Sequence, residues 1–417
     1  MNSAHVNRLL IAKGLRAFGD GFVSLLLPLY LLELGFSPLQ VGIVATATLL
    51  GSGILTLLVG LQAYRYPHRA LLLAATVLMV ATGVGFATVS QFWPLLLIAF
   101  VGTLNPSSGD VSVFLPLEHS LMSRVVADKN RTAMFARYSL VGSLAAAAGS
   151  LAVVLPGSMA NMLGWPVRTS MQAMFLLYAL LGALAALAYR GLPAVEKSSG
   201  PSTPAKPDAP LTKSKKTVYL LAALFSLDAF GGGFVVQSMM ALWLYQRFGL
   251  SLATAGEIFF WTGLLTALSY LVAVRIASRI GLVNTMVFTH LPANVCLLLI
   301  PFVPDLTWVI VLLFIRSALS QMDVPTRSSY VMSVVTPAER PAAASLTSVP
   351  RSLASAAGPF LSGYLLGMST FGWPLVVAGG LKIVYDLLLL VMFRKVKPNE
   401  EAASTTEKPA RLRQKIT

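Results

Sequence analysis

Charged residues are scarce in this chain, and acidic residues are the scarcest of all. Only 11% of its 417 residues are charged, with 16 acidic against 31 basic side chains, while 56% are hydrophobic. A soluble chain of this length needs far more polar surface, whereas helices that face lipid do not. The mean hydropathy of +0.75 points the same way. The composition therefore predicts an all-α integral membrane protein.

Cysteine and catalytic motifs are also missing. Cys296 is the single cysteine and lies in an apolar run, so neither a disulfide framework nor a thiolate metal cluster can form. The sequence has no Gly-x-x-x-x-Gly-Lys-Ser/Thr run for ATP and no set of residues arranged around a nucleophile. We therefore expect no cofactor, no metal site and no enzymatic activity.

The basic residues are placed as in a membrane protein. The formal net charge of +15 would suit nucleic acid, but Lys and Arg lie in short connections between apolar runs and in the tail. The connections that carry them also lie mainly on one side of the predicted membrane, with Arg168 and Arg247 the chief exceptions. This distribution predicts that both termini and the central linker face the cytoplasm. We expect a lipid bilayer and no nucleic acid as partner, a monomer, and a multi-pass location in the plasma membrane, of the bacterial inner-membrane kind.

Twelve stretches follow one another that are long and apolar enough to span a bilayer, at roughly 20 residues each. Their approximate bounds are 8–34, 38–63, 69–90, 92–126, 131–156, 167–190, 217–246, 251–276, 283–303, 306–335, 340–366 and 371–394. Pro, Ser and Lys between the sixth and seventh stretches predict a flexible linker. The predicted parts are a bundle at 1–190, a cytoplasmic linker at 191–216, a second bundle at 217–394 and a disordered tail at 395–417.

The two predicted bundles repeat each other in sequence. Arg16–Phe22 (RAFGDGF) returns as Asp228–Phe234 (DAFGGGF), and residues 116–131 align without a gap with residues 325–340. A direct repeat of six helices implies a pseudo-twofold axis along the membrane normal. The predicted fold is therefore twelve transmembrane helices in two pseudo-symmetric six-helix bundles.

With these features the chain resembles the major facilitator superfamily over about residues 8–394. The superfamily's signature after the second helix is Gly-x-x-x-Asp-Arg-x-Gly-Arg-Arg, and this chain reads GLQAYRYPHR, so its acidic position is occupied by a tyrosine. The corresponding place in the second half keeps an arginine and a glycine. The resemblance implies a cytoplasmic gate without its usual acid, formed by Gly60, Arg65, Arg69, Arg279 and Gly281.

Charged side chains inside the first helix of each half indicate a pathway, because charge within hydrocarbon is costly. Arg16 and Asp20 are four residues apart and share one helix face. Asp228 holds the repeat position of Arg16, so the two can face each other across the axis. The resemblance implies that these helices line a central cavity; the alternative is a structural clasp between helices.

The fourth helix of the first half contains a strong helix-breaking run, Asn105–Gly109, followed by Asp110 and then Glu118. Broken membrane helices persist only where protein or water satisfies the backbone, and such places often bind ligands. Asp110 and Glu118 are therefore predicted pathway residues. Their alternative roles are a helix cap and a group at the cytoplasmic boundary.

The tenth helix carries Arg316, Asp323 and Arg327, and Arg327 holds the repeat position of Glu118. This charge inversion predicts either a salt bridge between the two halves or an Arg327 site for an anionic group of the substrate. In the last helix, Lys382 and Asp386 are four residues apart, which favours an internal ion pair.

We therefore predict a secondary transporter whose bundles rock around a cavity lined by the first, fourth, seventh and tenth helices. The substrate is a small polar or amphiphilic molecule, moved by its own gradient or by protons or another ion loaded on the buried carboxylates. A drug or metabolite efflux pump of the same fold and a non-transporting membrane receptor or assembly partner are the alternatives. The predicted pathway residues are Arg16, Asp20, Asp110, Glu118, Asp228, Arg316, Asp323 and Arg327.

Overall fold

The computed structural model describes residues 3–62, 66–107, 112–125, 128–192, 214–336 and 339–394. Within these ranges all regular structure is helical, which confirms the all-α class. Most of the predicted linker and the whole predicted tail lie outside the described residues. The boundaries of the four predicted parts stay a prediction.

The first half of the chain folds into eight α-helices and one short 3₁₀ helix. They are α1 (Ser3–Glu33), α2 (Pro38–Gln62), α3 (His68–Thr88), α4 (Phe92–Val101), α5 (Phe114–Val125), α6 (Asp128–Leu151), η1 (Ala152–Val154), α7 (Leu155–Leu163) and α8 (Val167–Arg190).

The second half repeats this pattern. Its helices are α9 (Lys215–Gly233), α10 (Gln237–Phe248), α11 (Leu252–Ile280), α12 (Leu282–Leu299), η2 (Ile300–Phe302), α13 (Leu306–Leu319), α14 (Asp323–Val334), α15 (Arg340–Met368) and α16 (Trp373–Phe393).

Among the described residues, nine helical stretches are long and apolar enough to cross a membrane, and α4 and α13 are shorter apolar helices. The shorter pair arises because the fourth and tenth spans are each interrupted, between α4 and α5 and between α13 and α14. The 29 residues of α15 suffice in length, but Ser, Thr and Arg lower its hydropathy. The number of twelve spans itself stays a prediction.

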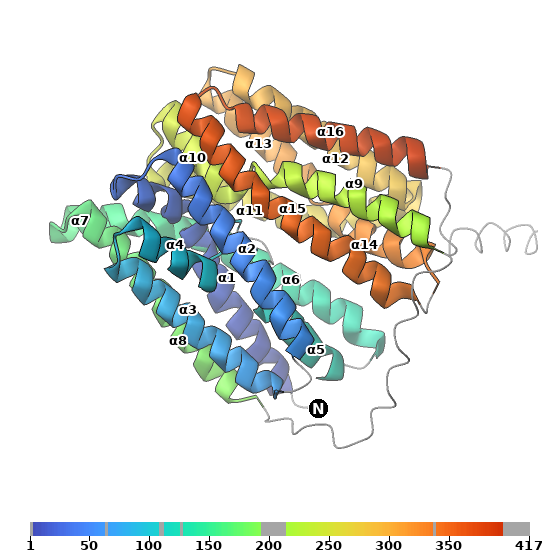
Figure 1. Cartoon of the computed structure of the whole chain (residues 1–417), viewed down its shortest axis with the longest axis horizontal. Helices are drawn as coiled ribbons and strands as arrows, with labels where there is room; N and C mark the ends of the chain where they lie inside the picture. Colours follow the sequence, from blue (N-terminus) through green and yellow to red (C-terminus); the bar gives the residue numbers. More distant parts are fainter. Residues whose placement is uncertain are drawn as a thin grey trace, which may run out of the picture.

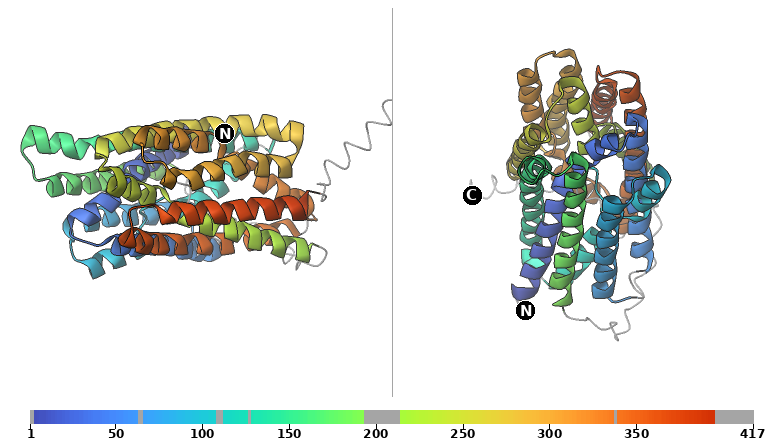
Figure 2. Two further views of the ribbon diagram at one scale, coloured as in Figure 1. Left: turned by 90° about the horizontal axis from the view of Figure 1, so that it is seen from above. Right: turned by 90° about the vertical axis from the view of Figure 1, so that its left-hand side faces the viewer.

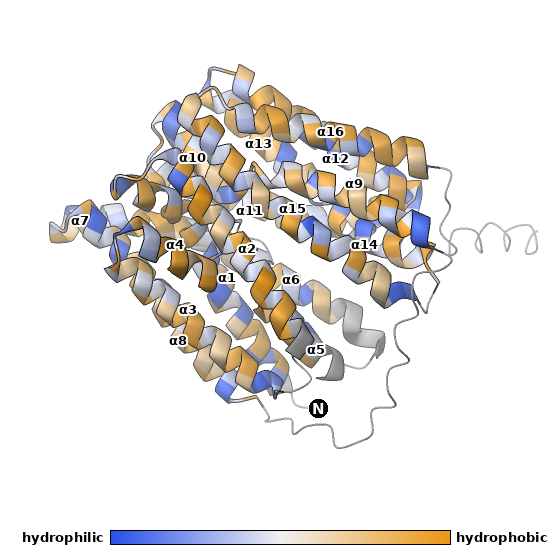
Figure 3. Cartoon of the chain, viewed as in Figure 1, coloured by the Kyte–Doolittle hydropathy of each residue, from blue (hydrophilic) through white to orange (hydrophobic). Residues whose placement is uncertain are grey.

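Large apolar side chains are exposed on helices of both halves, and hydrophobic residues, orange in Figure 3, make up much of these helices. Val77 is 67% exposed, Trp93 75% and Val391 81%. Such side chains in water would cost free energy, whereas lipid accommodates them. The outer surface is therefore that of a membrane protein, with its polar groups kept inside or at the ends.

The two halves diverge from one end of the molecule to the other (Figures 1 and 2). We call the end where α8 finishes and α9 starts the linker end, and the opposite end the closed end. The halves contact each other chiefly where α2 packs on α15 and α6 on α11. At the linker end, α5 and α14 pack on helices of their own half.

Backbone contacts join the halves at the closed end. A Cβ atom on Gly42 of α2 would lie 2.3 Å from the carbonyl oxygen of Pro359 on α15, so only glycine permits this approach. Gly363 of α15 meets α2 in the same way. A hydrogen bond crosses here as well, from Phe360 N to Thr46 Oγ1 at 2.9 Å. We call this contact of α2 with α15 the glycine seam.

Candidate functional site

A cavity of about 690 Å³ lies between the two halves. This size is within the range of about 300–1,000 Å³ that small-molecule sites occupy. The four predicted helices contribute to its wall through α1, α5, α9 and α13–α14, and α6, α11 and α15 contribute as well. The prediction was too narrow because α6, α11 and α15 make the contacts between the halves and therefore bound the space that those contacts enclose.

Arg16 and Glu118 form a buried ion pair between α1 and α5. Arg16 is 4% exposed and Glu118 is fully buried. The hydroxyl of Tyr189 donates to Glu118 Oε1 at 2.7 Å, and the hydroxyl of Tyr138 donates to Oε2. The Arg16 guanidinium also lies 4.0 Å from the centre of the Phe114 ring. The carboxylate thus has three donors, which is what a charge needs inside an apolar interior.

This pair is turned away from the cavity. The part of α1 that lines the cavity consists of Lys13, Ala17 and Asp20. Arg16 faces α5 instead, and Asp20 is half-buried at the cavity wall. Of the predicted pathway residues in the first half, Asp20 is therefore the described one that reaches the cavity, while Arg16 and Glu118 hold α1 against α5.

The second half carries a larger cluster of charges that does face the cavity. Asp228 on α9 accepts from Lys382 Nζ at 2.6 Å and from Arg327 Nη2 at 2.9 Å. Arg327 also pairs with Asp323 one helical turn before it on α14. All four side chains are buried and line the cavity. Asp228 therefore binds two cations from two different helices, and Asp323 supplies the second negative charge of the cluster.

The cluster continues through a histidine that also lines the cavity. His290 on α12 lies with Nε2 3.8 Å from Asp228 Oδ1 and Nδ1 2.9 Å from Asp386 Oδ1. Asn294 donates to Asp386 Oδ2 at 2.8 Å. The imidazole thus stands between two buried carboxylates, one at the cavity and one between α12 and α16.

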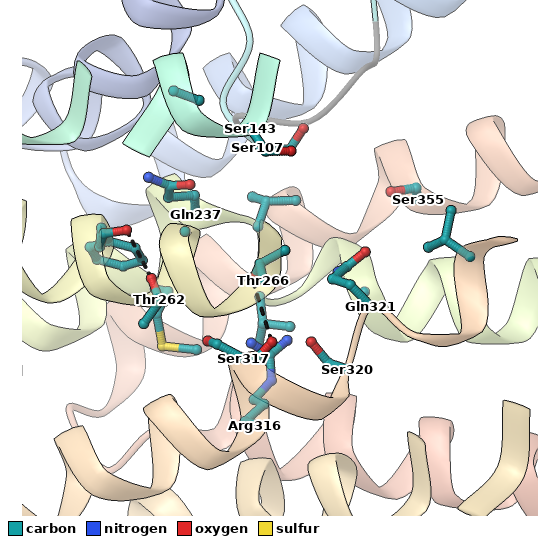
Figure 4. Close-up of a pocket in the computed structure, with 18 of the residues that line it drawn as sticks. Ser107, Ser143, Gln237, Thr262, Thr266, Arg316, Ser317, Ser320, Gln321 and Ser355 are labelled. Carbon is teal, nitrogen blue, oxygen red and sulfur yellow. Dashed lines mark hydrogen bonds between the residues drawn. The ribbon is translucent and has the colours of Figure 1, made fainter. Parts of the chain in front are cut away.

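Arg316 differs from the other buried arginines. It lies on α13 in the cavity wall, partly buried, close to Thr266, Ser317 and Ser320 (Figure 4). Its Nε is buried without a hydrogen-bond partner, which is also true of Arg16 and Arg327. The difference is that no carboxylate among the described residues pairs with Arg316, whereas Arg16 pairs with one and Arg327 with two.

A model of the Major Facilitator Superfamily matches residues 9–320 and 222–416 of this chain. The two matches together cover most of the sequence and overlap in the middle, as expected for a duplicated protein. The chain belongs to the Major Facilitator Superfamily. This confirms the resemblance drawn from the repeat, and it places the chain among secondary transporters of the membrane.

Relatives of known sequence or structure agree with the superfamily fold. An uncharacterized membrane protein of Saccharomyces cerevisiae, YJR124C, is 25% identical over 410 residues, which cover 91% of this chain and 92% of that protein. A mutant of the nucleoside transporter NupG superposes with a TM-score of 0.74 at 15% identity, covering 93% and 100% of the two chains. The human organic anion transporter MFSD10 does so with a TM-score of 0.65 at 18% identity, covering 93% and 100%. The two structures show the shared fold alone.

The superfamily gate predicted from the sequence can be followed only in part. Arg65 lies outside the described residues, and of Gly60 only the helical backbone in α2 is described. Arg69 is half-buried in the first turn of α3, and Arg279 is exposed in the last turn of α11. Gly281 has a φ of +84° between α11 and α12, a conformation that favours glycine. The described members lie at the linker end.

Two predicted pairings are corrected by this superfamily member's structure. Glu118 and Arg327 do not meet between the halves, because each pairs within its own half, with Arg16 and Asp228 respectively. By the same contacts, Arg16 and Asp228 do not face each other across the axis. Repeat-related residues occupy equivalent places in two bundles, so an inverted charge reverses the polarity of the local pair rather than creating a contact between bundles.

The predicted ion pair between Lys382 and Asp386 is also wrong. Lys382 reaches Asp228 and the cavity, and Asp386 binds His290 and Asn294. Residues four apart on a helix can turn to different neighbouring helices when those helices offer better partners. Asp110, a further predicted pathway residue, lies outside the described residues.

Several residues at these sites were not predicted from the sequence. They are Tyr138 on α6, Tyr189 on α8, and His290 and Asn294 on α12, three helices outside the four that were predicted to line the cavity. The sequence did contain one signal for these residues, namely polar groups within apolar runs. Hydroxyl and amide groups inside a membrane require hydrogen-bond partners, and a buried charged group is the strongest such partner.

Proposed function

We propose that this protein transports a small polar molecule across the membrane by alternating access, with the central cavity as the binding site. The observation that carries the proposal is that both halves wall the cavity while the glycine seam joins them at the closed end. Rocking about this contact would part the closed end and bring the linker end together. The proposed cavity residues are Asp20, Asp228, Arg316, Asp323 and Arg327.

The composition of the cavity wall favours a polar substrate over a bulky apolar drug. Hydroxyl and amide side chains such as Thr262, Ser320, Gln321 and Ser355 point into it (Figure 4). Polar groups in a pocket set the orientation and the identity of the ligand. A receptor or assembly partner would have no need for such a wall, so transport of a polar molecule is the function that the site supports best.

We further propose that both termini and the linker lie in the cytoplasm of a plasma membrane, so that the linker end is the cytoplasmic end. The one-sided distribution of Lys and Arg supports this orientation. Arg16 and Glu118 then act as a fixed support of the first bundle, and Arg69, Arg279 and Gly281 belong to the moving cytoplasmic ends. A monomer suffices, because one chain supplies both walls of the cavity.

Distance measurements between labels at the linker end test the rocking motion. With Cys296→Ser removing the native thiol, Tyr66→Cys and Ser278→Cys place spin labels on the exposed ends of the first and second halves. We expect a second, shorter distance to appear when a transported substrate is added. A pair within the first half, Tyr66→Cys with Arg190→Cys, serves as control and keeps one distance.

An unchanged distance for the first pair in the presence of a transported substrate would refute the rocking mechanism. Absence of flux for every member of a metabolite and drug panel in proteoliposomes would refute transport itself. Preference for bulky apolar dyes would instead identify the drug efflux pump.

Protons are the coupling ion that we propose, and His290 is the group that passes them between Asp228 and Asp386. An imidazole ring can both donate and accept a proton, and its two nitrogens here face two carboxylates. The other groups around it are Lys382, which shares Asp228 Oδ1, and the ring of Tyr385. Arg327 holds the second oxygen of Asp228.

Flux driven by an imposed pH gradient tests the coupling. We expect accumulation of substrate against its gradient in the native protein, and exchange without accumulation in Asp386→Asn and His290→Asn. Flux that ignores the pH gradient, together with accumulation that follows sodium or the substrate alone, would exclude protons.

A further inference from the structure

Within the part of the chain that the structure describes, Arg316 in the cavity wall has no carboxylate partner. It lies in the cavity wall on α13, with its buried Nε lacking a partner, and no described carboxylate pairs with it. Two other basic groups of the same wall, Lys382 and Arg327, both bind Asp228. An ionised side chain inside a membrane protein is costly and is kept where function requires it. A negatively charged ligand would supply the counter-charge that the described residues do not give Arg316.

The charge balance of the whole cavity points in the same direction. Among the described residues that line it, five are basic and three are acidic. They are Lys13, Arg316, Arg327, Arg351 and Lys382 against Asp20, Asp228 and Asp323. Acidic and basic residues within the apolar runs are nearly balanced in the sequence. The excess of positive charge is found only among the described residues that line the cavity.

Hydroxyl and amide groups surround the Arg316 guanidinium. Thr266 of α11 donates to the carbonyl oxygen of Ser317 at 3.4 Å directly beside it, and Ser320 and Gln321 follow at the end of α13 (Figure 4). A guanidinium binds carboxylate and phosphate through two parallel N–H donors. Hydroxyl and amide groups next to that fork both donate and accept, which is what the hydroxyls of a sugar-like body need.

We infer that the transported molecule is a small organic anion rich in hydroxyl groups, and that Arg316 binds its carboxylate or phosphate. The inference rests on the proposed transport function and adds the charge class of the substrate. The anion would sit on α13, with its hydroxyl-bearing part against α11 and the end of α13. Entry of the anion would then neutralise Arg316 in the binding step itself.

Thermal-shift measurements on the purified full-length protein test this inference with probes matched in size. The probes are gluconate and glucose 6-phosphate as anions, glucose as the neutral analogue and glucosamine as the cation. A ligand that binds the folded state raises Tm with concentration. We expect at least one of the two anions to raise Tm, and which of them does so distinguishes a carboxylate from a phosphate ligand. Glucose and glucosamine should bind with about tenfold lower apparent affinity or not at all.

Arg316→Gln should remove the preference for the anion by about tenfold or more in apparent affinity, and Arg316→Lys should retain part of it because charge remains while the fork is lost. Arg168→Gln, which removes an exposed arginine on α8, is the matched control and should leave the apparent affinity for the anion unchanged. The Arg316→Lys variant also shows that loss of binding is not loss of folding.

The inference is overturned if neither anion raises Tm, if glucose or glucosamine acts as strongly as the anions, or if Arg316→Gln keeps the anion preference. Flux in proteoliposomes separates this failure from failure of the transport proposal. Transport of glucose or glucosamine with rejection of both anions would leave transport intact and refute the anion. Absence of flux for any panel molecule would refute transport.

Discussion

The two halves contain the same buried ion pair with reversed polarity, and their surroundings differ. In the first half the cation is on α1 and the anion on α5, as Arg16 and Glu118; in the second the anion is on α9 and the cation on α14, as Asp228 and Arg327. The first pair is closed off by two tyrosine hydroxyls. The second is open to the cavity and to further ionisable groups.

This difference separates a structural role from a functional one in a duplicated protein. An ion pair whose two charges fully compensate each other has no better partner to move to, and breaking it leaves an uncompensated buried charge. A pair that shares its charges with Lys382, Asp323 and His290 has other partners within reach. We therefore propose that the contacts of the second bundle change during transport and that the first bundle supports it.

The largest effect is expected from breaking the closed pair. Glu118→Gln leaves Arg16 buried without its carboxylate, and we expect the free energy of unfolding to fall by about 3–5 kcal/mol. Asp228→Asn should lose less stability, because Arg327 keeps Asp323. Thermal unfolding of the purified variants measures both.

The double variant Arg16→Met with Glu118→Leu is the control for this experiment. It removes both charges at once, so most of the lost stability should return. Equal losses for Glu118→Gln and Asp228→Asn would contradict the distinction between the two pairs.

Reversal of each pair is expected to have an intermediate effect and to sharpen the comparison. Arg16→Glu with Glu118→Arg gives the first half the polarity of the second, and we expect it to lose less stability than Glu118→Gln because the two exchanged charges still compensate each other. Asp228→Arg with Arg327→Asp places a cation at position 228 beside Lys382. That reversal should abolish flux, and native flux in this variant would show that the second pair is as self-contained as the first.

The smallest effect on thermal stability is expected for Arg316, where the substitution should not lower Tm. Arg316→Gln removes a partly buried cation without a carboxylate partner, so Tm without ligand should stay level or rise by about 1–3 °C. Arg327→Gln should lower Tm, since it leaves Asp228 and Asp323 short of a donor. A clear fall in Tm for Arg316→Gln would mean that the protein itself neutralises this residue.

The sequence alone predicted the duplicated fold and the helices that carry charge, because apolar periodicity and a repeat need no knowledge of distances. It could not predict which charges touch. The alignment of Glu118 with Arg327 identified equivalent positions but not neighbours, and the spacing of Lys382 and Asp386 identified a shared helix face but not the helices opposite it. Contacts between helices far apart in the chain depend on how the helices pack, which no local pattern contains.

The same limit explains the residues that were missed. Tyr138 and Tyr189 are aromatic, and in an apolar run an aromatic side chain is most simply interpreted as packing or lipid contact. Their hydroxyl groups gain a role only once Glu118 is placed between α6 and α8. Charge was the more informative signal, since every described charged residue in the predicted pathway proved to be paired or to line the cavity.

The glycine seam has a consequence for how temperature affects the transport cycle. Peptide groups at Gly42 and Gly363 form part of the contact between α2 and α15, so its separation uncovers amide surface along with apolar side chains of both halves. Newly wetted amide and hydrocarbon change the heat capacity in opposite directions. The amide part of this contact should therefore reduce the curvature of the van 't Hoff plot for the balance between the two orientations of this carrier.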